Sequence, residues 1–116
     1  YETDSSIKFI VAIKSRIDSL AVGLHQYGIK ENHVVGIYSP NHVEYPIISF
    51  AAIKLGAIAT TANPTYTPDE LNFQLVDSGA TVLVTTLELV ENAKKAIVNT
   101  NSLFSLFLSF FFFFFF

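Results

Sequence analysis

Hydrophobic residues near the start of the chain recur at helical spacing. The apolar positions that lie three and four residues apart form one stripe: Ile10, Ile13, Ile17, Leu20 and Leu24. This pattern predicts an amphipathic helix over residues 7–27, with its stripe packed into the core. Gly28 is expected to end the helix. Its N-cap is expected among Asp4, Ser5 and Ser6.

Beyond residue 33 the pattern changes to short apolar runs that alternate with helix-length amphipathic segments. Three runs rich in β-branched residues predict strands: Val34–Tyr38, Ala57–Thr61 and Thr81–Thr85. The first run is apolar at nearly every position, which is typical of a strand buried on both faces. Strands joined by helices of ten or more residues pair in parallel. We therefore predict an α/β fold, with a partial parallel sheet of three strands and flanking helices.

Two helix starts between these strands carry capping signals. Thr67-Pro68-Asp69-Glu70 combines a hydroxyl cap, a proline at the first helical position and two acids in the first turn. That helix is expected to end at Gly79. Asn41 and Glu44 resemble a second capping box, before a helix that Gly56 ends. Because Pro46 would lie deeper than the first helical position, we expect it to kink this helix.

Two further local features concern a turn and the last helix. Asn32 lies in the polar turn before the first strand and is the residue there that best tolerates a positive φ. Thr86 is expected to cap a helix with acids early and lysines late. Glu91 and Lys95 lie four residues apart in that helix, so we expect them to form an ion pair.

Composition excludes several classes of function. The net charge of −3 and the pI near 5.5 give no basic surface for nucleic acid. The absence of cysteine excludes disulfides and thiolate metal sites. The sequence also contains no methionine, so we expect the natural start of the protein to lie outside it. The compartment cannot then be inferred from a leader.

The segment after residue 101 differs from the rest, because Ser102–Phe116 contains only Ser, Leu and Phe. It is shorter than the ~17–25 apolar residues that cross a bilayer, so a membrane anchor is not favoured. Seven consecutive phenylalanines also show neither helix nor strand periodicity. Since Ser, Leu and Phe can all be encoded by T and C alone, we interpret the segment as a translated pyrimidine tract. Such a run would favour β-aggregation.

Several short motifs together resemble the N-terminal part of AMP-forming acyl-CoA synthetases, the adenylate-forming superfamily. These motifs are Val35-Gly36-Ile37, Ser39-Pro40-Asn41, Lys54-Leu55-Gly56-Ala57, Thr61-Ala62-Asn63-Pro64 and Tyr66-Thr67-Pro68-Asp69-Glu70-Leu71. The last two look most like the 4-coumarate–CoA ligase and luciferase branch. The resemblance covers about Ser15 to Ala96. Two positions depart from it: Asn32-His33 stand where the family has Gly-Asp, and Phe9–Ile13 lack its aromatic–Glu-Leu signature.

The resemblance implies a two-step reaction in the parent enzyme. A carboxylic acid would attack the α-phosphate of ATP, with Mg, and coenzyme A would then displace AMP. In the family, the phosphate loop and the catalytic acids and lysine lie downstream of the part resembled here. The resemblance therefore implies no catalytic, cofactor-binding or metal residue in this chain. It also implies an intracellular location, cytoplasmic or peroxisomal, and leaves the acid substrate and the oligomeric state open.

Other candidate residues are better explained by structure than by chemistry. Ser78–Thr81 lacks the second glycine and the lysine of a phosphate loop, so it is interpreted as a helix end. Asn63–Thr67 follows a strand, where α/β sheets bind ligands, but a structural turn is favoured over substrate contact. Glu31 and Glu44 are interpreted as capping residues rather than as an acid–base pair.

The three histidines carry no metal-binding pattern. His25, His33 and His42 share no helical face and have no paired carboxylate at ligand spacing. They are interpreted as surface or helix-end residues.

The hypothesis that follows divides the chain in two. Residues 1–100 would form the N-terminal part of an AMP-dependent synthetase or ligase domain, and residues 101–116 a low-complexity tail. The chain alone is expected to lack ligase activity. One alternative is a stand-alone α/β binding module, which would unfold cooperatively and bind a ligand saturably. The other alternative is a tail-anchored membrane protein, which the shortness of the tail disfavours.

Overall fold

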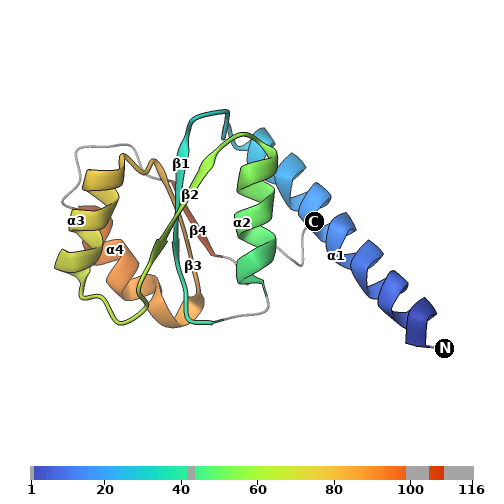
Figure 1. Cartoon of the computed structure of the whole chain (residues 1–116). Coiled ribbons are helices and arrows are strands. Elements are labelled where there is room, and N and C mark those ends of the chain that lie inside the picture. Colours follow the sequence, from blue (N-terminus) through green and yellow to red (C-terminus); the bar gives the residue numbers. More distant parts are fainter. Residues whose placement is uncertain (1, 42–43, 99–104, 109–116) are drawn as a thin grey trace.

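The computed structural model describes residues 2–41, 44–98 and 105–108 (Figure 1). Helices and strands alternate along the chain in the order α1 (Glu2–Gln26), β1 (Val34–Tyr38), α2 (Tyr45–Lys54), β2 (Ile58–Ala62), α3 (Pro68–Ser78), β3 (Val82–Thr85), the 3₁₀ turn η1 (Leu87–Leu89), α4 (Val90–Val98) and β4 (Ser105–Leu108). This alternation confirms the predicted α/β class and all three predicted strands.

The strands form one parallel sheet with the spatial order β2-β1-β3-β4. In this order the chain moves from β1 outward to β2, then returns across β1 to β3. Gly36 in the middle of β1 lies opposite Thr60 on one side and Leu83 on the other. The point where the direction of winding reverses therefore lies between β1 and β3, and α/β sheets bind ligands at such points.

Helices cover both faces of the sheet (Figure 1). On one face α1 and α2 pack against Val35 and Ile37 of β1, and the buried residues there form one core cluster. On the other face α3 and α4 pack against Tyr38 and Leu83 in a second cluster. Successive residues of a strand point to opposite faces, so the apolar run of β1 serves both cores.

Glycine in the middle of β1 allows α3 to approach the sheet closely. A Cβ atom built on Gly36 would lie 2.9 Å from Cδ2 of Leu75 and 3.2 Å from Cδ1 of Leu83. Both leucine side chains are fully buried. A side chain at position 36 would therefore require the Leu75 or Leu83 side chain to shift within a packed core.

The boundaries of α3 agree with the prediction from its capping residues. The Thr67 hydroxyl accepts a hydrogen bond from the Glu70 amide, and the Glu70 carboxylate accepts one from the Thr67 amide. Pro68 takes the first helical position, and Gly79 ends the helix with a φ of 71°. Asn32 likewise adopts the predicted positive φ, of 69°.

The predicted start of α2 is wrong. The N-cap is Glu44, which makes no side-chain cap hydrogen bond, so Asn41 and Glu44 do not form a capping box. Because the helix begins at Tyr45, Pro46 lies in the first turn, where no backbone N–H is needed, and the expected kink has no cause. The Glu44 carboxylate instead contacts the Arg16 guanidinium of α1 at 3.4 Å.

Two details of α4 also differ from the prediction. Thr86 precedes η1 and makes no side-chain cap hydrogen bond, because a 3₁₀ turn separates it from α4. Glu91 pairs with Lys94, three residues on, at 3.7 Å, where a pair with Lys95 was expected.

Helix α1 begins earlier than predicted and is packed only along its second half. Asp4, Ser5 and Ser6 lie inside the helix, so none of them is its N-cap. The apolar stripe is buried at Leu20 and Leu24 but 64% exposed at Ile10, which corrects the expectation that the whole stripe packs into the core. Figure 1 shows why, since the N-terminal half of α1 extends beyond the end of α2.

Part of the Ser/Leu/Phe segment forms a strand that the sequence pattern did not predict. Residues Ser105–Leu108 form β4, which pairs in parallel with β3 from Val82 to Thr85. The rest of that segment lies outside the described residues. Among the residues that the structure describes, none of the helices is both long and apolar enough to cross a membrane.

Candidate functional site

The carboxyl ends of β1 and β2 open into a hollow of about 760 Å³. Two turns and the start of α2 line it: Ser39, Pro40, Asn41, Tyr45, Thr61, Ala62, Asn63, Pro64 and Tyr66. The hollow is the candidate site, because parallel sheets present their ligands at this edge. Its described lining is amide, hydroxyl, aromatic and apolar, with no charged side chain.

The turn after β2 is held by its own side chains. The Asn63 Oδ1 atom accepts hydrogen bonds from the Thr65 amide at 2.9 Å and from the Thr65 hydroxyl at 2.8 Å. The Tyr38 hydroxyl donates to the Tyr66 carbonyl at 2.8 Å. The side-chain oxygen of Asn63 is therefore already hydrogen-bonded within the turn. This agrees with the interpretation of Asn63–Thr67 as a structural turn.

Hydroxyl groups also gather where β1 and β3 end. The buried Thr85 hydroxyl donates to the Tyr38 carbonyl at 2.8 Å, and the Ser39 hydroxyl donates to the Pro40 carbonyl at 2.8 Å. Thr86 follows them and is 7% exposed, and its hydroxyl oxygen has no hydrogen-bond partner among the described residues. The Thr85–Tyr38 hydrogen bond joins the ends of β1 and β3, at the point where the direction of winding reverses.

This set of side chains does not fit the triphosphate of ATP. Phosphates are held by lysine, arginine or consecutive backbone amides, often with a magnesium ion held by carboxylates. Among the residues that the structure describes, the lining of the hollow supplies neither cations nor carboxylates. No step of the family's reaction can therefore be assigned to its residues.

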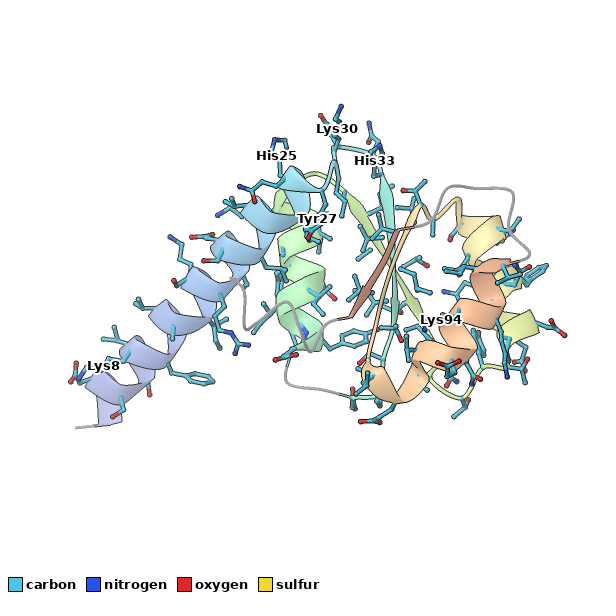
Figure 2. All side chains as sticks on the ribbon, turned by 180° about the vertical axis from the view of Figure 1, so that it is seen from behind. Lys8, His25, Tyr27, Lys30, His33 and Lys94 are labelled. Atoms are coloured by element: carbon cyan, nitrogen blue, oxygen red, sulfur yellow. The ribbon has the colours of Figure 1, made fainter. Side chains whose placement is uncertain are left out.

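The remaining candidates lie away from this hollow. Figure 2 shows His25, Lys30 and His33 at the turn between α1 and β1, which is the opposite end of the sheet. His33 accepts a hydrogen bond at Nδ1 from the Lys30 amide at 3.0 Å and so helps to hold that turn. His42 lies outside the described residues. Within the described residues, no three His, Asp or Glu side chains are placed to hold a metal ion.

The other sequence candidates belong to turns and helix ends. Glu31 is exposed beside Gly56, and Ser78–Thr81 contains the end of α3 and the entry to β3, as interpreted from the sequence. Glu31 lies in the turn between α1 and β1, whereas Glu44 is the N-cap of α2 and its carboxylate contacts Arg16.

One charged pair links the two helices on the α1–α2 face. Lys54 donates a hydrogen bond to the Asp18 carboxylate, and this bond is the main reason that the pKa of Asp18 lies below its usual value. Both side chains are substantially exposed. The pair therefore joins exposed positions of α1 and α2, and neither residue lines the hollow.

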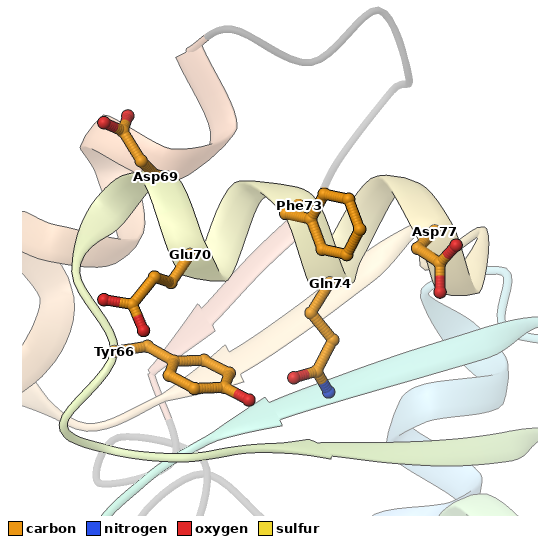
Figure 3. A pocket seen from close by; sticks show the side chains of 6 residues that line it. All are labelled: Tyr66, Asp69, Glu70, Phe73, Gln74 and Asp77. Atoms are coloured by element: carbon orange, nitrogen blue, oxygen red, sulfur yellow. The ribbon is translucent and has the colours of Figure 1, made fainter.

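A second hollow, of about 490 Å³, lies along the outer side of α3 (Figure 3). It is lined by Tyr66, Asp69, Glu70, Phe73, Gln74 and Asp77. The Gln74 amide donates to the Thr61 carbonyl at 2.7 Å and so reaches the edge strand β2. Sequence reasoning missed this surface, although the spacing of Glu70, Gln74 and Asp77 places them on one helical face.

Comparison with known proteins identifies the family. The family model of AMP-binding enzymes matches residues 12–106, most of the chain. The chain therefore belongs to the AMP-binding enzyme family. The match begins within α1, after the overhanging first turns, and ends within β4.

Among curated relatives, the similarity is to CoA ligases. The chain is 40% identical over 80 residues to 4-coumarate–CoA ligase-like 2 of Arabidopsis thaliana, covering 69% of this chain and 14% of that protein. It is 36% identical over 77 residues to a long-chain-fatty-acid–CoA ligase of Haemophilus influenzae, covering 66% and 14%. The chain thus spans about one seventh of the length of these relatives.

Solved structures give the same result. A long-chain-fatty-acid–CoA ligase from Archaeoglobus fulgidus superposes with a TM-score of 0.80 and 31% identity, over 84% of this chain and 20% of that one. A benzoate CoA ligase from Burkholderia xenovorans has a TM-score of 0.75 at 20% identity, which shows the shared fold.

Proposed function

We propose that this chain is an N-terminal structural segment of an ATP-dependent carboxylic acid–CoA ligase of the 4-coumarate ligase type. The observation that carries the proposal is the 40% identity over 80 residues to a 4-coumarate–CoA ligase-like protein. It is supported by the family match over residues 12–106, which contain β1–β3 and their helices. In the complete enzyme this segment would support the sheet, and ATP, Mg and coenzyme A would be bound by residues beyond it.

The chain alone is proposed to have no ligase activity. The described lining of the hollow at the carboxyl ends of β1 and β2 is uncharged, whereas adenylate formation needs cations and carboxylates around a triphosphate. The division into residues 1–100 and a separate tail, 101–116, belongs to the same proposal. We also propose an intracellular location, and one relative is named a peroxisomal OPC-8:0-CoA ligase.

A chimeric enzyme tests the proposal. The 77 matching residues of the Haemophilus influenzae long-chain-fatty-acid–CoA ligase would be replaced by the corresponding residues of this chain. If the segment is equivalent, the chimera retains fatty acyl-CoA formation. A matched chimera with Gly36→Leu should lose it, because a leucine cannot fit against Leu75 and Leu83. A first chimera that folds but forms no acyl-CoA would contradict the proposal.

A further inference from the structure

The outer face of α3 combines three features that together indicate a docking surface. The first is charge: three carboxylates, Asp69, Glu70 and Asp77, line the hollow there, and none of its described lining residues is basic. The second is apolar area: Tyr66 contributes to the hollow, and Phe73 is 73% exposed on its rim. Figure 3 shows Glu70 and Gln74 pointing toward Tyr66 and the strand below α3, whereas Asp69 points the other way.

The third feature is the edge strand beside the hollow. β2 is the outermost strand of the described sheet on this side. In an edge strand, the backbone N–H and C=O groups of every second residue point away from the sheet and have no strand partner. Here the Gln74 side-chain amide donates hydrogen bonds to the Thr61 carbonyl at 2.7 Å and to the Thr60 hydroxyl at 3.2 Å. An incoming backbone amide could replace the Gln74 amide as the donor to Thr61.

The position of Asp77 is unfavourable for α3 by itself. It lies in the last turn of the helix, which contains no basic residue, and a carboxylate there faces the negative end of the helix dipole. The side chain is exposed and has no ion-pair partner among the described residues. A cation brought by a partner would remove this unfavourable interaction.

We propose that this surface receives an extended basic segment from the polypeptide that follows in full-length relatives. That segment would lie against β2 and place lysine or arginine side chains near Glu70 and Asp77, with its apolar residues on Tyr66 and Phe73. The source is inferred from length, because the matched stretch makes up 14% of each of these relatives and most of their chain lies outside it. The inference rests on the proposed function.

A peptide array tests this inference with the whole 116-residue chain. Overlapping 15-residue peptides would cover the part of Arabidopsis thaliana 4-coumarate–CoA ligase-like 2 that lies outside the matched 80 residues. We expect binding to basic peptides, at least tenfold weaker for the Asp77→Lys variant and weaker in high salt. Glu88→Lys is the matched control, since it makes the same charge change at an exposed residue outside the hollow. It should bind within twofold of the wild type.

Folding does not confuse the comparison, because lysine in the last turn of α3 favours the helix. Circular dichroism of Asp77→Lys should match that of the wild type, and the milder Asp77→Asn should show an intermediate loss of binding. Equal binding by the wild type and Asp77→Lys would overturn the inference, as would no binding to any basic peptide. Self-association that Asp77→Lys abolishes would also overturn it, because the partner would then be a second copy.

The outcome is separable from the test of the proposed function. Peptide binding together with an inactive chimera would support the docking surface and contradict the ligase assignment. An active chimera together with unchanged binding by Asp77→Lys would support the ligase assignment and contradict the docking surface.

Discussion

Both halves of helix α1 carry apolar residues at helical spacing, but their surroundings differ. In the second half, Leu20 and Leu24 are 5% and 2% exposed, because α2 and the sheet lie against them. In the first half, Ile7 and Ile10 are 55% and 64% exposed. Helical periodicity therefore identifies the face that can be buried, but the length of the neighbouring helix decides how much of that face is buried. The family match begins at residue 12, close to where the packing begins.

The strongest test of this comparison is a pair of truncations in α1. Leu24→Ala should lower the free energy of unfolding by about 2–5 kcal/mol, because it leaves a cavity against a packed core. Ile10→Ala should change it by less than about 0.5 kcal/mol, because the side chain is already in solvent. Urea unfolding followed by circular dichroism measures both. Equal losses for the two variants would show that the first half of α1 is covered in solution.

The close contact across β1 should give the next largest effect. Gly36→Ala places a methyl group 2.9 Å from Leu75 Cδ2, so we expect a loss of about 1–3 kcal/mol. Leu75→Ala made in the same chain should offset part of that loss, since it removes the atom in contact. Thermal unfolding of the two single variants and the double variant gives the coupling. Simple additivity would mean that this contact does not limit the packing of α3.

A smaller loss of stability is expected from removing the cap of α3 at Thr67, compared with a change at Thr86, which caps no helix through its side chain. Thr67→Ala removes the hydroxyl bonded to the Glu70 amide and should cost about 0.5–2 kcal/mol. Thr86→Val is the comparison, since the Thr86 hydroxyl makes no cap hydrogen bond and is buried. That variant should be neutral or slightly stabilising. A loss as large as that of Thr67→Ala would indicate a contact at Thr86 outside the described residues.

The smallest effect concerns the pair that joins α1 to α2. The pKa of Asp18 is lowered in the folded state by Lys54, so the pair stabilises the fold above the unfolded-state pKa. This stabilisation is lost as the pH falls through the folded-state pKa, below the ordinary value of 3.8. Lys54→Met should raise the pKa of Asp18, as measured by NMR titration of its carboxyl carbon. Lys95→Met, at an exposed lysine of α4, should leave it unchanged.

Much of this architecture could be predicted from local sequence. The capping box, Pro68 and Gly79 set both ends of α3, because these residues act within one turn of the helix. Runs of β-branched residues located β1, β2 and β3. The start of α2 was harder, since the Glu44 carboxylate contacts Arg16 of α1, a residue 28 positions away.

Other features depended on contacts that no local pattern specifies. Strand β4 arises because β3 offers an edge to pair with, and its Ser-Leu-Phe-Leu sequence carries little periodicity of its own. The hollow at the carboxyl edge combines residues from two turns and α2, and only its Asn63–Thr67 side was singled out from the sequence. The spacing of Glu70, Gln74 and Asp77 was the one local signal that could have indicated the α3 surface.

The central claim is that this segment provides structure and that the chemistry needs residues outside it. Acid-dependent ATP–pyrophosphate exchange by the purified 116-residue chain tests this most directly, since it detects adenylate formation without coenzyme A. The account predicts exchange at the background rate with aromatic and fatty acids alike. A rate above background that depends on the added acid would contradict it.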